Sequence, residues 1–479
     1  MSDDPAARAA KPAVVTEGDR PVTFREIFSV GEYRAVYLSL VVNWLGDYLA
    51  RAAITVLVYQ QSKSVLLSAA AFAVSFLPWI IGGTLLSALA ERYPYRRVLI
   101  TSDLFRMVLI ALLLIPHLPV GSLLALLFLA SLGTPPTQAA RSALLPLLVG
   151  RDRLPIAIAT NATTGQAAQV VGYLAGAALA TGVNPQVALA IDVVTFGVSA
   201  ALIATGVRPR PAARTRAERR HLLRESGEGF RIVFGRETLR AIAVMVFVLT
   251  MFAVVPEGLA AAWAAQGDPD AVTRGLDQGL IMAAGPIGFV AGGLLTGRVF
   301  SPARRNRLIR PLAVVSALIL VPAIAGPPPP AVAALVALSG VAQGVVSPTL
   351  NSRFVLILPH GYRARAYGVI QAGMQLSQFA AVMITGVLAD RFWLPLVVGL
   401  WSVGGTVAMF VLATRWPSEE AFAAATEAAA QGNAAARSEE IAAERAAEPV
   451  LEPGLEQELE PAPGSDRTVA TTSVTPERS

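Results

Sequence analysis

Two residues of opposite charge lie within an apolar stretch near the start of the chain. The segment from Asn43 to Arg51 reads NWLGDYLAR, and Asp47 and Arg51 are four residues apart, so they share one face of a helix and can form an ion pair. A neighbouring arginine favours the carboxylate, whereas removal from water favours the protonated acid. Asp47 is therefore a candidate for binding and releasing a proton. A permanent structural ion pair is the alternative interpretation.

Glu257 is the second candidate for proton binding. It directly follows Pro256 in another apolar run. Proline removes a backbone hydrogen bond and breaks or kinks a helix. We therefore expect a helix break here, with Glu257 beside a cavity.

Polar uncharged side chains recur at helical spacing in two further apolar runs, around residues 166–169 and 371–378. Glutamines three or four residues apart share one helix face. Such side chains contact a ligand or join helices by hydrogen bonds, and both interpretations stay open. The predicted lining of a substrate cavity is Asn43, Arg51, Gln166, Gln169, Gln371 and Gln375.

Residues typical of enzymes and metal sites are scarce. The chain has no cysteine, and its three histidines, His117, His221 and His360, lack metal-ligand spacing. The sequence also lacks the GxxxxGK[ST] phosphate loop of ATP-driven proteins. We expect no enzyme, no metal and no cofactor, and a proton gradient as the driving force.

The composition predicts how these residues are positioned. Of 479 residues, 54% are hydrophobic and only 15% charged, against about 25% charged in soluble domains. Apolar runs long enough to cross a bilayer, about 20 residues, occur repeatedly, without the period of two of a membrane barrel. We predict an all-α integral membrane protein with twelve transmembrane helices. Their expected spans are 34–58, 65–90, 98–116, 121–148, 154–181, 187–207, 240–263, 278–300, 308–326, 331–358, 366–389 and 393–414.

Arginines in the connecting loops predict the orientation. Alternate loops hold 22 arginines, whereas the other set holds three basic residues, Lys63, Arg274 and Arg391. By the positive-inside rule the first set faces the cytoplasm, and both termini lie inside. The net charge of +6 is thus explained by topology, and we expect no nucleic-acid partner.

Two segments of the first half recur in the second. LAERYPYRRVLI, from Leu89, resembles LTGRVFSPARRNRLI, from Leu295, and PTQAARSALLP, from Pro136, resembles PTLNSRFVLILP, from Pro348. The offsets between them are 206 and 212 residues, and the pair Arg151 and Arg153 recurs at Arg363 and Arg365 with an offset of 212. Nearly constant offsets predict two parallel six-helix halves.

These motifs resemble those of the major facilitator superfamily of transporters. SALAERYPYRR, from Ser87 to Arg97, resembles the superfamily's G-x-L-A-D-R-x-G-R-R, with serine, glutamate and proline at the first, fifth and eighth positions. ARSALLP from Ala140, RDRL from Arg151, ATNA from Ala159 and RARAYG from Arg363 resemble a subgroup of macrolide and siderophore exporters. The resemblance covers about residues 30–415.

The resemblance implies two pseudo-symmetric six-helix bundles and a proton-coupled efflux pump for amphipathic drugs or secondary metabolites. It also implies a cytoplasmic charge cluster that latches one half against the other. In this cluster we expect Glu91 to pair with an arginine of a neighbouring helix end, and Arg92, Arg96 or Arg97 to pair with Asp103; the alternative is that the arginines only fix the topology. An importer or facilitator, and a non-transporting membrane scaffold or receptor, remain alternative functions. The residues of the implied gating motif are Glu91, Arg92, Arg96, Arg97 and Asp103.

The resemblance bears on two further positions. Antiporters of this family often carry proline where this chain has Tyr173, within GQAAQVVGYLAG. Asp192 lies in the sixth helix, which is usually peripheral in this architecture, so it is a weaker candidate for proton binding, and we expect an interface residue near the outer surface.

Segments outside the helices complete the organisation. We predict a cytoplasmic tail over 1–32 without the apolar core of a secretory signal, bundles over 33–207 and 240–415, and an arginine-rich linker over 208–239 with a short amphipathic helix within 221–235. Residues 416–479 carry 13 acidic and four basic residues, which predicts a mostly disordered tail, helical around 418–446.

With 37 arginines, two lysines and much alanine, the chain is typical of a GC-rich bacterial genome. The composition favours a bacterial cytoplasmic membrane as the location. We also expect a monomer, with the lipid bilayer and a small-molecule substrate as partners.

Overall fold

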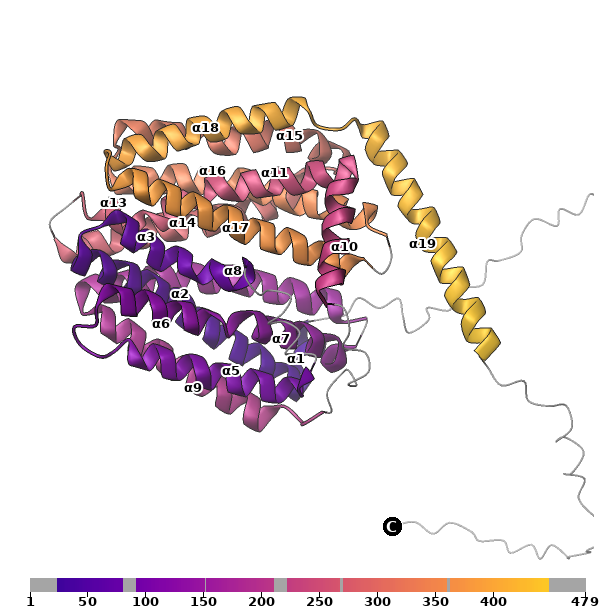
Figure 1. The fold of residues 1–479 in the computed structure, drawn as a ribbon, viewed down its shortest axis with the longest axis horizontal. Coiled ribbons are helices and arrows are strands. Elements are labelled where there is room, and N and C mark those ends of the chain that lie inside the picture. The colour runs from indigo at the N-terminus through magenta and orange to yellow at the C-terminus, as the bar shows by residue number, and fades with distance from the viewer. Residues whose placement is uncertain are drawn as a thin grey trace, which may run out of the picture. The chain divides into compact units, whose positions relative to one another are not determined.

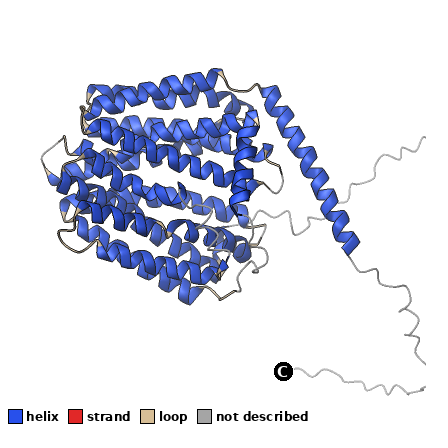
Figure 2. Cartoon of the chain, viewed as in Figure 1, coloured by secondary structure: helices blue, strands red, loops and turns tan. Residues whose placement is uncertain are grey.

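The computed structural model describes residues 24–80, 92–150, 152–210, 222–267, 270–359 and 362–447. Throughout these ranges the secondary structure is helical, without a strand (Figure 2). Contacts divide the chain into two units, residues 1–430 and 431–479. The bundle described below belongs to the first unit.

The first half of the bundle follows a short helix, α1 (Phe24–Phe28). The second helix was predicted over 65–90. The structure describes it as far as residue 80, and the rest of the predicted span lies outside the described residues. The fourth is divided at Gly133, just before Pro135 and Pro136, as expected from the missing amide hydrogens of proline. The elements are α2 (Gly31–Ser62), α3 (Val65–Ala73), η2 (Val74–Phe76), α5 (Tyr95–Leu112), α6 (Val120–Ser131), α7 (Thr134–Val149), α8 (Leu154–Gly182) and α9 (Pro185–Gly206).

The second half begins after the linker helix α10 (Leu222–Gly235), which confirms the predicted linker helix. Its first helix breaks around Pro256, also as predicted. The elements are α11 (Glu237–Ala253), α12 (Val255–Gly258), α13 (Ala260–Ala264), α14 (Ala271–Val299), α15 (Pro302–Leu318), η4 (Val321–Ala325), α16 (Pro329–Ile357), α17 (Arg363–Ala389) and α18 (Leu394–Thr414). The tail helix α19 (Glu419–Ala447) matches the predicted helical stretch.

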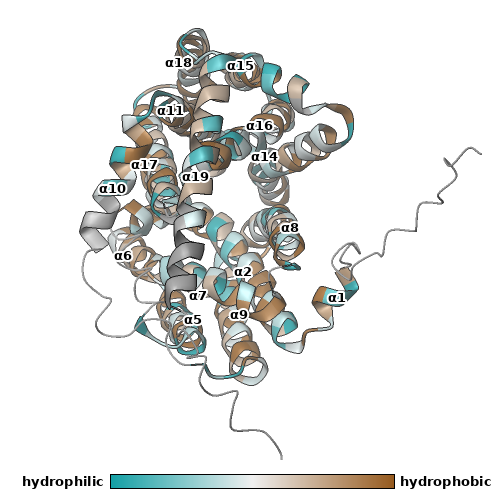
Figure 3. Ribbon diagram, turned by 90° about the vertical axis from the view of Figure 1, so that its right-hand side faces the viewer, coloured by the Kyte–Doolittle hydropathy of each residue, from teal (hydrophilic) through white to brown (hydrophobic). Residues whose placement is uncertain are grey.

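Within the described residues, nine helical segments are long and apolar enough to cross a membrane. They are α2, α6–α7, α9, α11–α13, α14, α15–η4, α16, α17 and α18. The other three predicted spans correspond to α3 with η2, α5 and α8. Seen along their axes, most ribbons are brown or white (Figure 3), and large apolar side chains such as Val194, Val407 and Phe410 are exposed where lipid would cover them.

Close backbone approach between α14 and α16 forms the core of the second half. A Cβ atom on Gly288 or Gly292 would overlap backbone carbonyl oxygens of α16, and one on Gly340 or Gly344 would overlap those of α14. Small residues four apart on both helices let backbones approach this closely, which is how membrane helices associate without a hydrophobic driving force. In the first half, α2 packs in the same manner against Gly172 and Gly176 of α8.

The two halves lie side by side as the indigo-to-magenta and magenta-to-yellow parts of Figure 1. We call the end that carries the arginine loops, with Arg96, Arg210 and Arg305, the arginine-rich end, and the end that carries Lys63 and Asp390 the opposite end. Helix α8 packs on α14 and α3 packs on α17. These contacts join the halves towards the opposite end.

Asp390 holds the halves together at the opposite end. Its carboxylate accepts hydrogen bonds from the Ser64 hydroxyl (2.7 Å) and from the backbone amides of Val65 (2.6 Å) and Leu66 (3.2 Å). These groups form the start of α3, where unpaired amide hydrogens and the helix dipole attract an anion. Asp390, at the end of α17, therefore caps a helix of the other half.

We expect Asp390→Ala to weaken closure of the opposite end. Helix caps contribute about 0.5–2 kcal/mol, so the ratio of closed to open molecules should fall about two- to thirtyfold. Because the chain has no cysteine, disulfide formation between Leu66→Cys and Gly386→Cys can report closure; a Cβ on Gly386 lies 3.2 Å from Leu66 Cα. The cross-linking rate should fall in Asp390→Ala and stay unchanged in Asn184→Ala, where Asn184 caps its own helix α9. Equal rates in both variants would refute the assigned role.

Candidate functional site

A cavity of about 350 Å³ lies where the two halves meet. From the first half it is lined by Asp47 and Arg51 of α2, Arg106 of α5 and Asp192 of α9, and from the second by Glu257 of α12. A neighbouring cavity of about 270 Å³ is lined by Gln169 and Glu257 as well. The two cavities therefore adjoin at these residues, with ionisable groups concentrated on the side of the first half.

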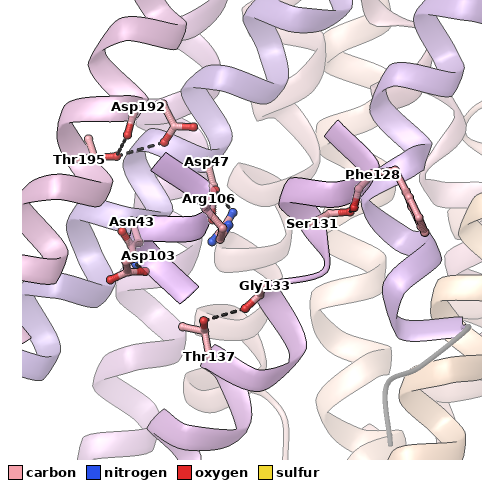
Figure 4. A network of polar contacts seen from close by, with 10 residues as sticks. All are labelled: Asn43, Asp47, Asp103, Arg106, Phe128, Ser131, Gly133, Thr137, Asp192 and Thr195. Atoms are coloured by element: carbon pink, nitrogen blue, oxygen red, sulfur yellow. Dashed lines mark hydrogen bonds and ion pairs between the residues drawn. The ribbon is translucent and has the colours of Figure 1, made fainter. Parts of the chain in front are cut away.

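Asp47 forms an ion pair with Arg106 (Figure 4). The side chains are 25% and 10% exposed, so the pair is largely removed from water but still reaches the cavity. The Arg106 guanidinium also lies 4.4 Å from the ring centroid of Phe196, and its stem packs against Gly133. These contacts hold Arg106 in place beside Asp47.

The predicted ion pair between Asp47 and Arg51 is wrong. Although the two residues share a helix face, the Arg51 guanidinium lies 5.5–5.9 Å from the ring centroids of Tyr48, Phe72 and Phe76. Cation–π attraction to several rings stabilises a buried guanidinium, while α5 supplies a closer cation to Asp47. Arg51 does line the cavity.

Asp103 belongs to a buried polar network in the first half, which corrects its predicted pairing with the arginines of the loop. It is 0% exposed and accepts hydrogen bonds from Asn43 Nδ2 (3.0 Å) and Ser199 Oγ (2.6 Å). Asn43, predicted in the cavity lining, thus lies against Asp103 (Figure 4). Two turns of α5 separate Asp103 from the helix start, and its hydrogen-bond partners are Asn43 and Ser199 instead of the loop arginines.

The predicted gating arginines lie at the arginine-rich end. Arg96 donates from Nη2 to the carbonyl oxygen of Ala204 (2.6 Å) at the end of α9. Arg92 and Arg97 are exposed. Glu91 lies outside the described residues. The contact of Arg96 stays within the first half, so the latch between halves remains a prediction.

Glu257 is bonded by the other half. The Tyr173 hydroxyl of α8 donates to Glu257 Oε1, and Gln169 Nε2 donates a long hydrogen bond of 3.5 Å to the same oxygen. Glu257 therefore lies at the contact of α8 with α12, beside the helix break that Pro256 produces. The tyrosine that replaces the family's proline is the residue that binds this carboxyl group.

The predicted glutamines come together only in part. Gln169 lines both cavities, Gln166 lines the second and Gln375 the first. Gln371 is half-buried one turn from Gln375 on α17. Gln378, on the same face, lines both cavities. Amide side chains from α8 and α17 thus contribute to the lining of both cavities.

The duplicated arginines Arg141 and Arg353 occupy matching positions in the two halves. Both are buried: Arg141 Nη2 donates to Ser39 Oγ (3.4 Å), and Arg353 binds Glu419 (2.5 Å) and lies 4.5 Å from the Phe422 ring. Glu419 and Phe422 belong to the start of α19. The second arginine therefore fixes the beginning of the tail helix.

Asp192 lies in the cavity lining, so its predicted peripheral position is wrong. It is 1% exposed and comes so close to α2 that a Cβ on Gly46 would overlap its carboxyl group. The only signal in the sequence was the small residue at position 46, one position from Asp47. Arg106 was missed as well, although its spacing of three from Asp103 places both on one face of α5.

Comparison with known proteins identifies the architecture. The family model described as Major Facilitator Superfamily matches residues 36–378 and 269–455. Macrolide efflux protein A of Streptococcus pyogenes is 24% identical over 233 residues, which cover 47% of this chain and 56% of that protein. The match thus spans about half the length of this curated relative.

Solved transporters share the fold. The nucleoside transporter NupG is 14% identical over 80% of this chain and 98% of its own, with a TM-score of 0.60. A peptide transporter POT in complex with sulfate is 14% identical over 83% of this chain and 97% of its own, with a TM-score of 0.60. A bacterial homologue of the iron transporter ferroportin, in an inward-facing state, is 16% identical over 82% of this chain and 99% of its own, with a TM-score of 0.58. At these identities the likeness concerns the fold alone.

Proposed function

This chain belongs to the Major Facilitator Superfamily, whose model matches most of its length, and we propose that it is a proton-coupled exporter of amphipathic small molecules. As a member of that family it is a multi-pass membrane protein and a secondary transporter of a small-molecule substrate. Membership of a transporter family agrees with the prediction that the chain is not an enzyme. The coupling ion, the direction and the substrate class are what we propose.

The main support for proton coupling is the pair of carboxyl groups in one cavity between the halves. Asp47 is bound by a guanidinium of its own half, whereas Glu257 is bound by a hydroxyl and an amide of the other half. Ionisable residues within a membrane are costly and usually serve transport. A change in the charge of Glu257 would alter contacts between the halves, which links protonation to their relative position.

The lining of the cavity supports an amphipathic substrate. Tyr48, Phe72, Phe76 and Trp79 provide aromatic surface on one side. Glutamines of α8 and α17 provide hydrogen-bonding groups on the other. Apolar walls with a few polar groups are typical of small-molecule sites, and the macrolide efflux protein is a relative consistent with export.

Contacts between the halves at the opposite end support alternating access. Asp390 and the packing of α8 on α14 join the halves there. We propose that the arginine-rich end faces the cytoplasm, with both termini inside a bacterial inner membrane, and that the halves 33–207 and 240–415 rock about the central cavity. The charge cluster with Glu91, Arg92, Arg96 and Arg97 would then act at the inner end, and the transporter would work as a monomer.

Reconstitution in liposomes tests the proposed function. We expect purified protein under an imposed pH gradient to accumulate ethidium or radiolabelled erythromycin, a macrolide. Asp47→Asn should reduce accumulation to the level of empty liposomes because the residue can no longer exchange a proton. Asp152→Asn, which removes an exposed loop carboxylate, should transport as wild type does.

The other outcomes separate the alternatives. Equal accumulation by wild type and Asp47→Asn would assign Asp47 a structural role and direct attention to Glu257. Flux that follows only the gradient of the compound, with no response to pH, would indicate a facilitator. Absence of flux for every compound would favour an importer of another solute or a non-transporting membrane protein.

A further inference from the structure

Asp192 is a buried carboxyl group that the proposed function has not used. It projects from α9 towards α2, where Gly46 leaves room for it, and it is 1% exposed. Its charged neighbours are Asp47 of α2 and Arg106 of α5. Figure 4 shows Asp192, with Thr195 beside it, above and to the left of the Asp47–Arg106 pair.

Hydrogen bonding from Thr195 gives the Asp192 carboxyl group little stabilisation as an anion. Thr195 Oγ1 lies 2.7 Å from the backbone carbonyl oxygen of Asp192 and 3.1 Å from its Oδ1. A hydroxyl group has one hydrogen to donate, so Thr195 shares it between the carbonyl and, at the longer distance, Oδ1. The Asp192 carboxyl group therefore receives weaker hydrogen bonding from Thr195 than Asp103 receives from Asn43 and Ser199, and weak hydrogen bonding to a buried carboxylate favours the neutral acid.

The balance of charges leads to the same conclusion. Arg106 is the guanidinium beside both Asp47 and Asp192, and it is already paired with Asp47. A second, unpaired negative charge buried beside the first would be very costly. A neutral Asp192 avoids that cost.

Other titratable groups near Asp192 have partners of their own. Asp103 of α5 accepts from Asn43 and Ser199, and Arg141 of α7 lies near Asp103. Helix α8 also packs on α9, and its one titratable residue, Tyr173, donates to Glu257. Asp47, Arg106 and Asp192 therefore form a distinct trio.

We propose that Asp192 carries the exchangeable proton and that Arg106 alternates between Asp47 and Asp192. In the state described here, ionised Asp47 pairs with Arg106 and Asp192 is neutral. In the other state this proton has passed to Asp47, which faces the cavity as a neutral acid, and ionised Asp192 pairs with Arg106. The proton then leaves Asp47 for the cavity, and Asp192 takes up another as Arg106 returns to Asp47, so one proton enters at Asp192 and one leaves at Asp47 in each cycle. The net charge of the trio is zero in both states, so the exchange leaves no uncompensated charge in the membrane. This inference rests on proton coupling as the proposed function.

Infrared spectroscopy of the purified protein in nanodiscs tests the protonation of Asp192 without any substrate. We expect a carbonyl stretch of a protonated carboxyl group at neutral pH, which Asp192→Asn removes. Asp47→Asn should also remove it, because Arg106 then becomes available to pair with Asp192 and favours its ionised form. Asp103→Asn is the matched control; it replaces a buried carboxylate that accepts two hydrogen bonds and should leave the band in place. A band that persists in Asp192→Asn would overturn the proposal.

Transport measurements test the role of the proton. In liposomes, Asp192→Asn should lose ethidium accumulation driven by a pH gradient but retain exchange of ethidium for labelled ethidium at equal pH, since exchange needs no proton release. Loss of both activities in a folded variant, or retention of both, would contradict the assignment. Absence of flux in wild type would refute the exporter of ethidium while the infrared result still decides the protonation of Asp192.

Discussion

Arg106→Met is expected to destabilise the protein by about 3–5 kcal/mol, the typical cost of leaving one member of a buried ion pair without its partner. Methionine keeps most of the apolar stem that packs against Gly133, so the lost charge is the main change. The variant leaves Asp47 beside Asp192 without a guanidinium. Asp47→Asn removes the charge that Arg106 compensates, but leaves the guanidinium near Asp192 and should cost less.

The double variant Asp47→Asn with Arg106→Met should recover most of this stability, because neither an unpaired cation nor an unpaired anion is left. Denaturant or thermal unfolding in detergent, compared across wild type, both single variants and the double variant, gives the interaction energy of the pair. If the double variant is as unstable as Arg106→Met, the contribution of Arg106 lies in its packing on Phe196 and not in its charge. Gradient-driven transport should be absent from the double variant even where its stability recovers.

The helices were largely predictable from the sequence, because long apolar runs are incompatible with any other structure in a bilayer. Predicted and observed boundaries agree to the residue at Leu154, Ala389 and Thr414, and within two residues at the helix starts that Pro185 and Pro329 mark. The largest deviation is α14, which begins at Ala271, before the predicted start at 278. Its first turns contain Thr273, Arg274 and Asp277, whose polarity hides a helix that extends beyond the apolar run.

The partners within the site could not be read from the sequence to the same extent. Spacing along α2 suggested Arg51 as the ion-pair partner of Asp47. The spacing carries no information on how α5, which supplies the observed partner Arg106, is rotated about its axis. That rotation depends on packing against α7 and α9, and it turns Asp103 and Arg106 inward while Leu104 and Val108 face outward. Likewise Tyr173 stood out only as a departure from a motif, although it proves to be the residue bonded to Glu257.

Close packing of α8 against α14 holds the two halves together at the opposite end. Gly275 of α14 lies against the end of α8: a Cβ there would overlap the Thr181 hydroxyl and would come 2.9 Å from the carbonyl oxygen of Ala177. Backbone cannot withdraw as a flexible side chain can, so the helices must separate to accept a larger residue. Because α8 and α14 belong to different halves, this separation opens the opposite end.

Gly275→Leu is therefore expected to hold the opposite end open and abolish transport. Overpacking costs about 1–3 kcal/mol, which shifts a two-state equilibrium about 5- to 150-fold towards the open form. The disulfide between Leu66→Cys and Gly386→Cys should form correspondingly less, and gradient-driven accumulation of ethidium should fall with it. Gly297→Leu is the matched control on the same helix, since a Cβ at that position meets nothing within 4 Å. Normal cross-linking and normal transport in Gly275→Leu would show that α8 and α14 do not have to meet at this point for the cycle to proceed.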